Sequence, residues 1–256
     1  MAKVKTLILR APGTNCDFET KVAFEAVGAA VDSALVNELF RQEKRLADYQ
    51  IMVIPGGFTY GDDCSAGRIM ANEIRLRLGG DIDKFVADGR LILGICNGFQ
   101  VLVKAGILPG IKGQGRQPVT LTNNDSGKFE CRWIYLKVQE KSPCVFTRGM
   151  EGMYLPVAHG EGKLVAGADL ADRLNIVVQY VDEKGNTGAG YPHNPNGSVR
   201  DIAGICDDSG RIFSLMPHPE RFIRWTQHPR WTRETPRAAG DGLQVFVNAV
   251  SWVKGI

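Results

Sequence analysis

The chain has 256 residues, of which 44% are hydrophobic and 23% charged, and its formal net charge is +3 at pH 7. Acidic residues are interleaved with basic ones, and no stretch approaches the ~18 consecutive apolar residues of a membrane span. The first apolar run, residues 4–9, is too short for a signal peptide. We therefore expect a cytoplasmic protein that binds neither a membrane nor nucleic acid, and whose six cysteines are reduced thiols. With no C-x-x-C and no H-E-x-x-H, we predict no metal site.

The first half of the chain alternates short apolar runs with segments of helical periodicity. The runs predict buried strands over residues 4–9, 31–36 and 50–54, and the periodic segments predict helices over 18–27, 68–78 and 82–88, with a short helix or turn in 39–49. This order is typical of an α/β fold with a doubly wound, mostly parallel sheet flanked by helices. In such sheets the loops at the carboxyl ends of the strands build the site.

The most informative stretch is residues 90–103, which reads RLILGICNGFQVLV. An apolar strand runs into Gly94-Ile95-Cys96-Asn97-Gly98, and a helix begins at once. This is the G-x-S-x-G nucleophile elbow with cysteine in place of serine. The helix that follows Cys96 directs free N–H groups and a positive dipole end at the sulfur, which favours the thiolate and a developing oxyanion. The alternative is a buried structural cysteine between two glycines.

A glycine-rich loop follows the third predicted strand, at Pro55-Gly56-Gly57-Phe58-Thr59-Tyr60-Gly61-Asp62-Asp63. Gly56 and Gly61 have P-loop spacing, but two aspartates occupy the positions of the Lys-Ser/Thr pair and would repel a triphosphate. The loop therefore predicts no phosphate site. Because it ends a parallel strand, as the Cys96 elbow does, we expect the two segments to meet at one edge of the sheet.

The second half of the chain adds turns and further strands. Residues 113–132 are polar and turn-rich, and residues 185–197 are dense in Gly, Asn and Pro and predict a long surface loop. Strands are predicted over residues 133–138, 155–159 and 176–181, a hairpin over 202–206 and 211–215, and a closing helix over 243–253. The hairpin indicates additional antiparallel strands beside the parallel sheet.

A cysteine nucleophile needs a base, and His218 is the best candidate among four histidines. It ends a predicted strand, Pro219 keeps its backbone extended, and Glu220 lies two residues on. In an extended chain residues i and i+2 project to one side, so Glu220 can orient the His218 imidazole. Alone, this triplet would more often be a solvated surface turn. His159 could line a pocket, whereas a surface position is the default for His193 and His228.

Taken together, these motifs make the chain resemble the class I, triad-type glutamine amidotransferases. The resemblance narrows to the glutaminases of the amidine-forming synthase in the fourth step of purine synthesis, through APGTNC at 11–16, PGGFTYGD at 55–62, PVAHGEG at 156–162, NPNGS at 194–198, DIAG at 201–204 and MPHPER at 216–221. The motifs occur along this chain in the same order as in that family. They imply a flavodoxin-like α/β fold and a single type 1 amidotransferase domain over residues 1–256, with a C-terminal extension from about residue 222.

The resemblance also implies roles. Cys96 would attack the glutamine amide carbon, His218 would transfer the proton and Glu220 would orient it. Backbone N–H groups of Gly57 or Phe58 and of Asn97 would form the oxyanion hole, and Gly56, Gln100, His159 and Gly160 would line the glutamine pocket.

The resemblance further implies partners. This chain would use L-glutamine and no cofactor of its own, and would pass ammonia to a separate synthetase subunit that uses ATP and Mg²⁺, with a further small subunit. Residues 124–132 and 221–231 differ from the small bacterial glutaminase subunit and are more similar to the C-terminal glutaminase domain of the large single-chain synthase. Two alternatives stay open: a DJ-1-like cysteine hydrolase, and a non-catalytic partner-binding module on the same fold.

Overall fold

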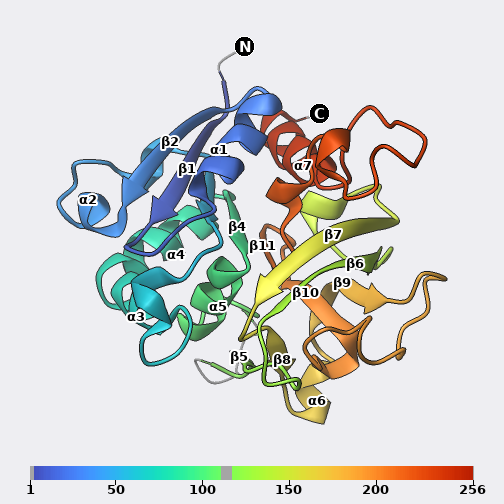
Figure 1. Cartoon of the computed structure of the whole chain (residues 1–256). Coiled ribbons are helices and arrows are strands. Elements are labelled where there is room, and N and C mark those ends of the chain that lie inside the picture. Colours follow the sequence, from blue (N-terminus) through green and yellow to red (C-terminus); the bar gives the residue numbers. More distant parts are fainter. Residues whose placement is uncertain (1–2, 111–116, 256) are drawn as a thin grey trace.

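A computed structural model describes residues 3–110 and 117–255. A nine-stranded sheet runs through it in the order β2-β1-β3-β4-β11-β10-β9-β6-β7, beside a two-stranded sheet of β5 and β8 (Figure 1). Neighbours from β2 to β11 pair in parallel, and those from β11 to β7 pair antiparallel. The predicted α/β class, with a mostly parallel half and additional antiparallel strands, is therefore confirmed.

The elements follow the alternation expected from the sequence. The strands are β1 (Lys5–Arg10), β2 (Ala30–Leu35), β3 (Ile51–Ile54), β4 (Leu91–Ile95), β5 (Thr120–Thr122), β6 (Glu130–Val138), β7 (Gly152–His159), β8 (Lys163–Val165), β9 (Asn175–Val181), β10 (Ile202–Cys206) and β11 (Ile212–Leu215). The α-helices are α1 (Asp17–Ala26), α2 (Val36–Phe40), α3 (Arg68–Glu73), α4 (Gly79–Ala87), α5 (Asn97–Lys104), α6 (Ala168–Ala171) and α7 (Leu243–Lys254). A π-helical turn, Ile74–Leu78, joins α3 to α4.

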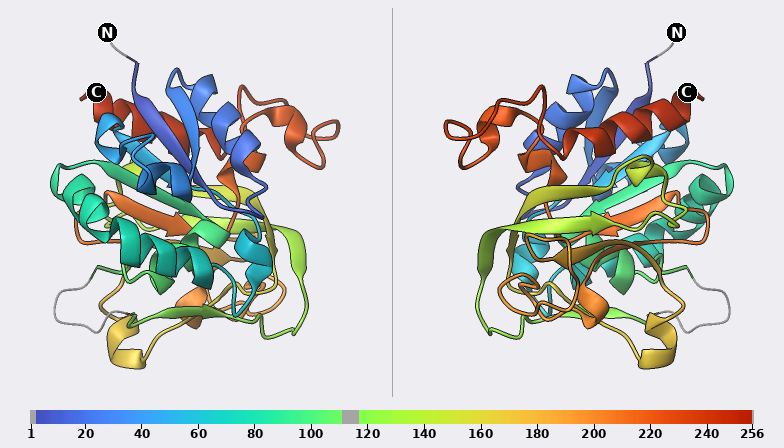
Figure 2. Two further views of the ribbon diagram at one scale, coloured as in Figure 1. Left: turned by 90° about the vertical axis from the view of Figure 1, so that its left-hand side faces the viewer. Right: turned by 90° about the vertical axis from the view of Figure 1, so that its right-hand side faces the viewer.

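Helices cover both faces of the parallel half. Helices α1 and α7 pack together on one face (Figures 1 and 2). The rings of Phe24 and Phe246 meet there edge to face, with centroids 5.0 Å apart. Helices α3, α4 and α5 lie on the other. Both central strands, β3 and β4, are buried along their whole length. Continuous apolar runs of this kind are typical of parallel strands buried on both faces, so these two strands were readable from the sequence.

The structure departs from the expectations where the local pattern is weak. The short element expected in residues 39–49 is split: α2 starts earlier, at Val36, and a single 3₁₀ turn covers Leu46–Asp48. Of the predicted turn-rich stretch 113–132, residues 113–116 lie outside the described residues. Within the rest, β5 pairs antiparallel with β8, and β6 begins at Glu130 rather than at 133. A three-residue strand carries no usable periodicity, and the polar start of β6 is stabilised by an Arg132–Glu130 ion pair.

Residues 222–242 form a segment that covers the outer edge of the sheet at β7. The ring of His228 stacks on that of Trp225, with the two centroids 4.9 Å apart. Asp241 Oδ2 accepts a hydrogen bond from the backbone N–H of Tyr154 in β7 at 2.8 Å. Farther along the same strand, Pro156 offers no N–H and its carbonyl accepts His218 N–H at 2.9 Å. Since an open strand edge invites pairing with another chain, these contacts protect it. Within the described residues, no helix is both long and apolar enough to span a bilayer.

Candidate functional site

The turn between β4 and α5 has the geometry of a nucleophile elbow. Cys96 takes φ 51° and ψ −105°, a conformation that costs energy for a residue with a side chain. A Cβ at Gly98 would lie 1.9 Å from the carbonyl oxygen of Ile54 in β3, and one at Gly94 would lie 2.4 Å from Ser214 Oγ in β11. The flanking glycines are therefore required by the close approach of neighbouring strands, and they place Cys96 at the carboxyl edge of the sheet.

His218 and Glu220 follow β11, the next strand in the sheet. His218 Nδ1 and Glu220 Oε1 are 2.6 Å apart, and both residues are 1% exposed. Pro219 holds the chain between them in a single 3₁₀ turn that ends at Arg221. The second imidazole nitrogen, His218 Nε2, has no hydrogen-bond partner among the described residues. A carboxylate on Nδ1 leaves Nε2 as the free base. The pairing of Glu220 with His218 was expected, but the 3₁₀ turn makes it in place of the extended backbone that was expected.

The structure brings Cys96 and His218 together across Gly56. A Cβ added at Gly56 would lie 2.8 Å from His218 Cε1 and 3.4 Å from Cys96 Cβ. The backbone of the glycine-rich loop thus runs directly past both side chains, as expected for two loops at the same edge of the sheet. The Cys96 sulfur lies 3.7 Å from the carbonyl oxygen of Ala158.

Burial decides the resting protonation state of Cys96. It raises the pKa of the thiol well above its ordinary value, and the charge of Glu220 raises it further, while Arg221 and the N–H of Asn97 lower it. The thiolate favoured by the helix N-terminus is therefore not the resting form in the free chain, because loss of hydration outweighs the dipole. Cys96 rests as a thiol, so it would need a base to act as a nucleophile.

Of the expected oxyanion donors, Asn97 lies beside this sulfur, and Gly57 follows Gly56, whose backbone packs against Cys96. Asn97 N–H faces Cys96 Sγ at the start of α5. Phe58 N–H already donates to Gly13 O at 2.9 Å, so of the two alternatives Gly57 is the one whose N–H the backbone leaves available. Gly57 has φ 149°, and a Cβ there would lie 2.8 Å from Gly13 O. Gly57 and Asn97 form the donor pair that this geometry supports.

The residues expected to line the glutamine pocket lie around the same edge of the sheet, but their polar atoms differ in the hydrogen bonds that they already make. Gln100 Nε2 donates to Glu161 O at 2.5 Å, so its amide is engaged in the pocket wall. His159 is 2% exposed and its Nδ1 lies 3.1 Å from Asn124 Oδ1. Burial lowers the pKa of His159 to about 4, and it is neutral at pH 7. Gly160, which accepts Asn124 N–H, and Gly56 offer backbone alone. Their roles toward glutamine stay predictions.

Two residues beside the triad were not singled out by the sequence. Cys16, at the end of the loop after β1, is 1% exposed, and its sulfur accepts Arg221 Nη2 at 3.0 Å. Burial, followed by the charge of Glu220, raises the pKa of Cys16 to about 12, so it is a neutral thiol. Both residues sit inside the motifs that carried the resemblance. A contact across 205 positions leaves no local pattern that would pair them.

The same cluster has donor atoms of the kinds that bind metal ions. One ligand atom each of Cys16, His218 and Glu220 lies within 4.8 Å of the other two. The guanidinium of Arg221 on the Cys16 sulfur opposes a second positive charge there, and His218 Nδ1 is already bound to Glu220. This donor set fits proton transfer better than metal binding.

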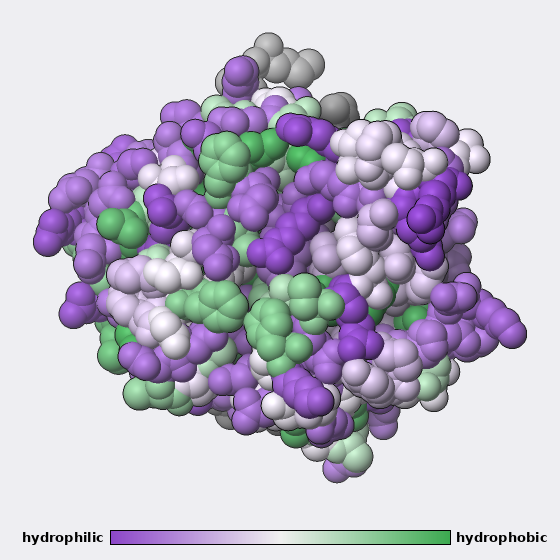
Figure 3. All heavy atoms as spheres, viewed as in Figure 1, coloured by the Kyte–Doolittle hydropathy of each residue, from purple (hydrophilic) through white to green (hydrophobic). Residues whose placement is uncertain are grey.

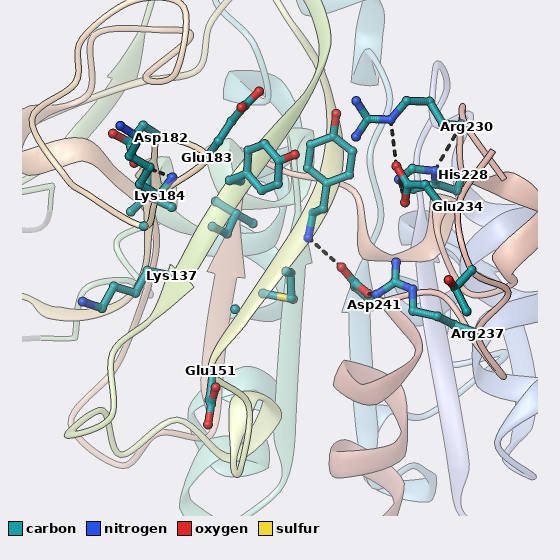
Figure 4. A pocket seen from close by; sticks show the side chains of 18 of the residues that line it. Lys137, Glu151, Asp182, Glu183, Lys184, His228, Arg230, Glu234, Arg237 and Asp241 are labelled. Carbon is teal, nitrogen blue, oxygen red and sulfur yellow. Dashed lines mark hydrogen bonds and ion pairs between the residues drawn. The ribbon is translucent and has the colours of Figure 1, made fainter.

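A cavity of about 850 Å³ lies away from the triad, between β6, β7 and residues 222–242 (Figure 4). None of the candidate residues lines it. Two of its arginines are paired: Arg230 with Glu234 at 2.9 Å and Arg237 with Asp241 at 2.6 Å. These ion pairs help to fix residues 222–242 on the sheet, and none of the groups that line the cavity belongs to the candidate site.

Comparisons with known proteins agree on one family. The family model described as a CobB/CobQ-like glutamine amidotransferase domain matches residues 3–253. Phosphoribosylformylglycinamidine synthase subunit PurQ of Dehalococcoides mccartyi is 58% identical over 256 residues, which cover 100% of both chains. The protein of the same name from Archaeoglobus fulgidus is 40% identical, with 98% of each chain covered.

Solved structures give the same picture. A chain in the structure of PurLQS from Thermotoga maritima superposes with a TM-score of 0.74 at 32% identity, covering 98% of this chain and 100% of that one. A glutamine amidotransferase from Thermotoga maritima has a TM-score of 0.56 at 15% identity, a likeness that supports the fold alone.

Proposed function

The chain belongs to the glutamine amidotransferase family, and on that premise we propose that it is the glutaminase subunit of phosphoribosylformylglycinamidine synthase. It releases ammonia from glutamine and passes it to a separate synthetase subunit, which uses ATP and Mg²⁺ to convert a formylglycinamide ribonucleotide into the amidine. The observation that carries the proposal is the elbow cysteine packed across Gly56 from an imidazole that a buried glutamate orients.

The chemistry follows from the positions of the groups. Cys96 Sγ attacks the side-chain amide carbon of glutamine as His218 Nε2 takes the thiol proton, which is required because burial keeps Cys96 protonated. N–H groups of Gly57 and Asn97 hold the negative oxygen. His218 returns the proton to the leaving nitrogen of the tetrahedral adduct, the C–N bond breaks, and ammonia departs to leave a γ-glutamyl thioester on Cys96. His218 then deprotonates a water that releases glutamate and restores the thiol.

We propose further that residues 1–256 act as one type 1 amidotransferase domain, with residues from 222 onward as an extension that protects the β7 edge. The chain works in the cytoplasm, in keeping with six free cysteines. Because the elbow, the base and the orienting carboxylate are all assembled, a non-catalytic binding module is disfavoured. The position of Glu220, two residues after His218 and hydrogen-bonded to its ring, also disfavours a DJ-1-like hydrolase.

Labelling and hydrolysis test this function. The chain, mixed with its synthetase subunit, should convert glutamine to glutamate and ammonia, and Cys96→Ala should reduce the rate by at least about 10³-fold. A diazoketone analogue of glutamine should modify Cys96 and spare the exposed Cys64 and Cys131, as read by peptide mass spectrometry. Modification chiefly of another cysteine, or full activity in Cys96→Ala, would refute the assignment.

A further inference from the structure

A buried lysine lies behind the elbow helix, and the chemistry above does not use it. Lys104, the last residue of α5, is 2% exposed. Its ammonium donates to Ser65 Oγ and to Ala66 O, both at 2.5 Å, and lies 3.5 Å from Glu161 Oε2. Burying an ammonium costs several kcal/mol unless its protons are matched, so this site is built around the charge.

Lys104 contacts a loop, residues 58–67, that the chain would not adopt unaided. Tyr60, Asp62, Cys64 and Ser65 have φ values of 56°, 58°, 64° and 143°, a region that disfavours residues other than glycine. Such conformations persist when surrounding contacts impose them. Ala66 supplies two of these contacts: its carbonyl accepts Lys104, and its N–H donates to the Glu161 carboxylate at 3.2 and 3.3 Å.

The other end of the same loop is tied to the candidate oxyanion hole. Thr59 Oγ1 donates to Asn97 Oδ1 at 2.7 Å, and Asn97 Nδ2 donates to Gln100 Oε1 at 2.8 Å and to Asp62 Oδ1 at 3.3 Å. Gln100 in turn donates to the backbone of Glu161. The loop, the elbow helix and the segment after β7 are thus joined by one buried hydrogen-bonded network, with Lys104 and Glu161 as its ion pair.

We infer that Lys104 is a positioning residue for glutamine hydrolysis: paired with Glu161, it fixes the 58–67 loop against α5 and so sets Gly57 N–H relative to Cys96. The inference rests on the proposed function, because it concerns the rate of that reaction. Lys104 touches no reacting atom. It acts through Ser65 and Ala66, and its charge acts on Asp62.

The electrostatics of Asp62 provide a second readout. Burial and the charge of Glu161 raise the pKa of Asp62 to about 6, while Lys104 and the N–H of Gly67 oppose the rise. Asp62 accepts Asn97 Nδ2 best as a carboxylate, so hydrolysis should weaken as the pH falls through about 6. Removing the lysine charge raises the pKa of Asp62 further, so the acidic limb of the rate profile should move to higher pH.

The experiment compares Lys104→Met and the double variant Lys104→Met/Glu161→Gln with wild type, in complex with the synthetase subunit. Lys44→Met is the matched control, since Lys44 also donates to a backbone carbonyl, Ser33 O at 2.8 Å, away from the elbow. We expect kcat for glutamine hydrolysis to fall by about tenfold to a hundredfold in Lys104→Met, the range expected when a hydrogen bond to a charged group is lost. KM should change less, because oxyanion donors act in the transition state.

Hydrogen exchange of residues 58–67 tests the loop independently of turnover. Exchange should be at least about tenfold faster in Lys104→Met and unchanged in Lys44→Met. If the single variant fails to fold, the double variant, which leaves no unpaired buried charge, gives the same comparison. If residues 58–67 exchange in Lys104→Met at the wild-type rate, or if kcat and the pH profile of that variant are unchanged, the inference is overturned. A wild-type chain inactive on glutamine would instead refute the proposed function, while the exchange rates would still decide whether Lys104 holds the loop.

Discussion

At the scale of single residues, two opposing effects act on the sulfur of Cys96. Burial and Glu220 keep Cys96 protonated, whereas Arg221 and the N-terminus of α5 favour its ionised form. A thiol that ionises when substrate arrives is protected from other electrophiles, but it depends on its base. His218, with Nδ1 held by Glu220 and Nε2 free, is therefore the residue on which the rate should depend most after Cys96.

The two partners of Cys96 should differ in how much their loss costs. His218→Ala removes the acceptor for the thiol proton and the donor to the leaving nitrogen, so kcat should fall nearly as far as in Cys96→Ala. Glu220→Gln keeps the shape and loses the charge that orients the imidazole, and its loss should be smaller by roughly a hundredfold. Steady-state hydrolysis rates check this order. A larger loss in Glu220→Gln than in His218→Ala would show that the roles are assigned wrongly.

The buried His159 predicts a pH dependence of stability. Burial lowers its pKa to about 4 from the ordinary value of 6.5, so the folded state resists a proton that the unfolded chain accepts. The contribution of neutral His159 to the free energy of unfolding is therefore fully present above pH 6.5. It is lost as the pH falls toward 4, and the total loss is on the order of 3 kcal/mol. Urea unfolding at about pH 7 and about pH 4.5 should show this loss in wild type and a smaller one in His159→Gln. Equal losses in both proteins would contradict it.

At the scale of elements, the elbow depends on the contact of α5 with β3. Gly98→Ala places a methyl group 1.9 Å from Ile54 O, so the helix must move and the free energy of unfolding should fall by about 1–3 kcal/mol or more. Gly79→Ala, in α4 with nothing within 4 Å of the added carbon, is the control and should raise it by about 0.5–1 kcal/mol. Thermal or urea unfolding distinguishes them, and equal effects would argue against the tight packing at the elbow.

The same elements show what the sequence could and could not reveal. The β4–α5 elbow was predictable, because a short-range pattern of glycines and apolar residues forces its backbone geometry. The pairing of His218 with Glu220 was expected too, but from an extended backbone, whereas the structure makes it through a 3₁₀ turn. Lys104 ends a helix as many surface lysines do, and its burial depends on Glu161, 57 positions away. β5 was missed for a related reason, since a three-residue strand is defined by its partner β8 rather than by its own pattern.

At the scale of the whole molecule, the face shown in Figure 3 is mostly hydrophilic, with apolar side chains gathered near its middle. Phe58, at the start of the 58–67 loop, is 42% exposed, and the centroid of its ring lies 6.3 Å from that of Phe129, which is 52% exposed. We expect the synthetase subunit to contact this pair, because ammonia must leave the site without escaping to solvent. Phe129→Ser should therefore weaken activation by the partner while changing the basal rate of the free chain by less than about twofold. Equal activation of both proteins in a titration with the partner would contradict this.

The central claim is that Cys96 of this chain supplies ammonia to chemistry on another polypeptide. Its most direct test is ATP-dependent amidine formation by the reconstituted complex, with either glutamine or an ammonium salt as the nitrogen source. With wild-type chain, both sources should give product. With Cys96→Ala, ammonium should still give product and glutamine should not, because the synthetase subunit is intact and only the glutaminase is lost. Glutamine-dependent product with Cys96→Ala, or product from this chain and ATP without the synthetase subunit, would contradict the account.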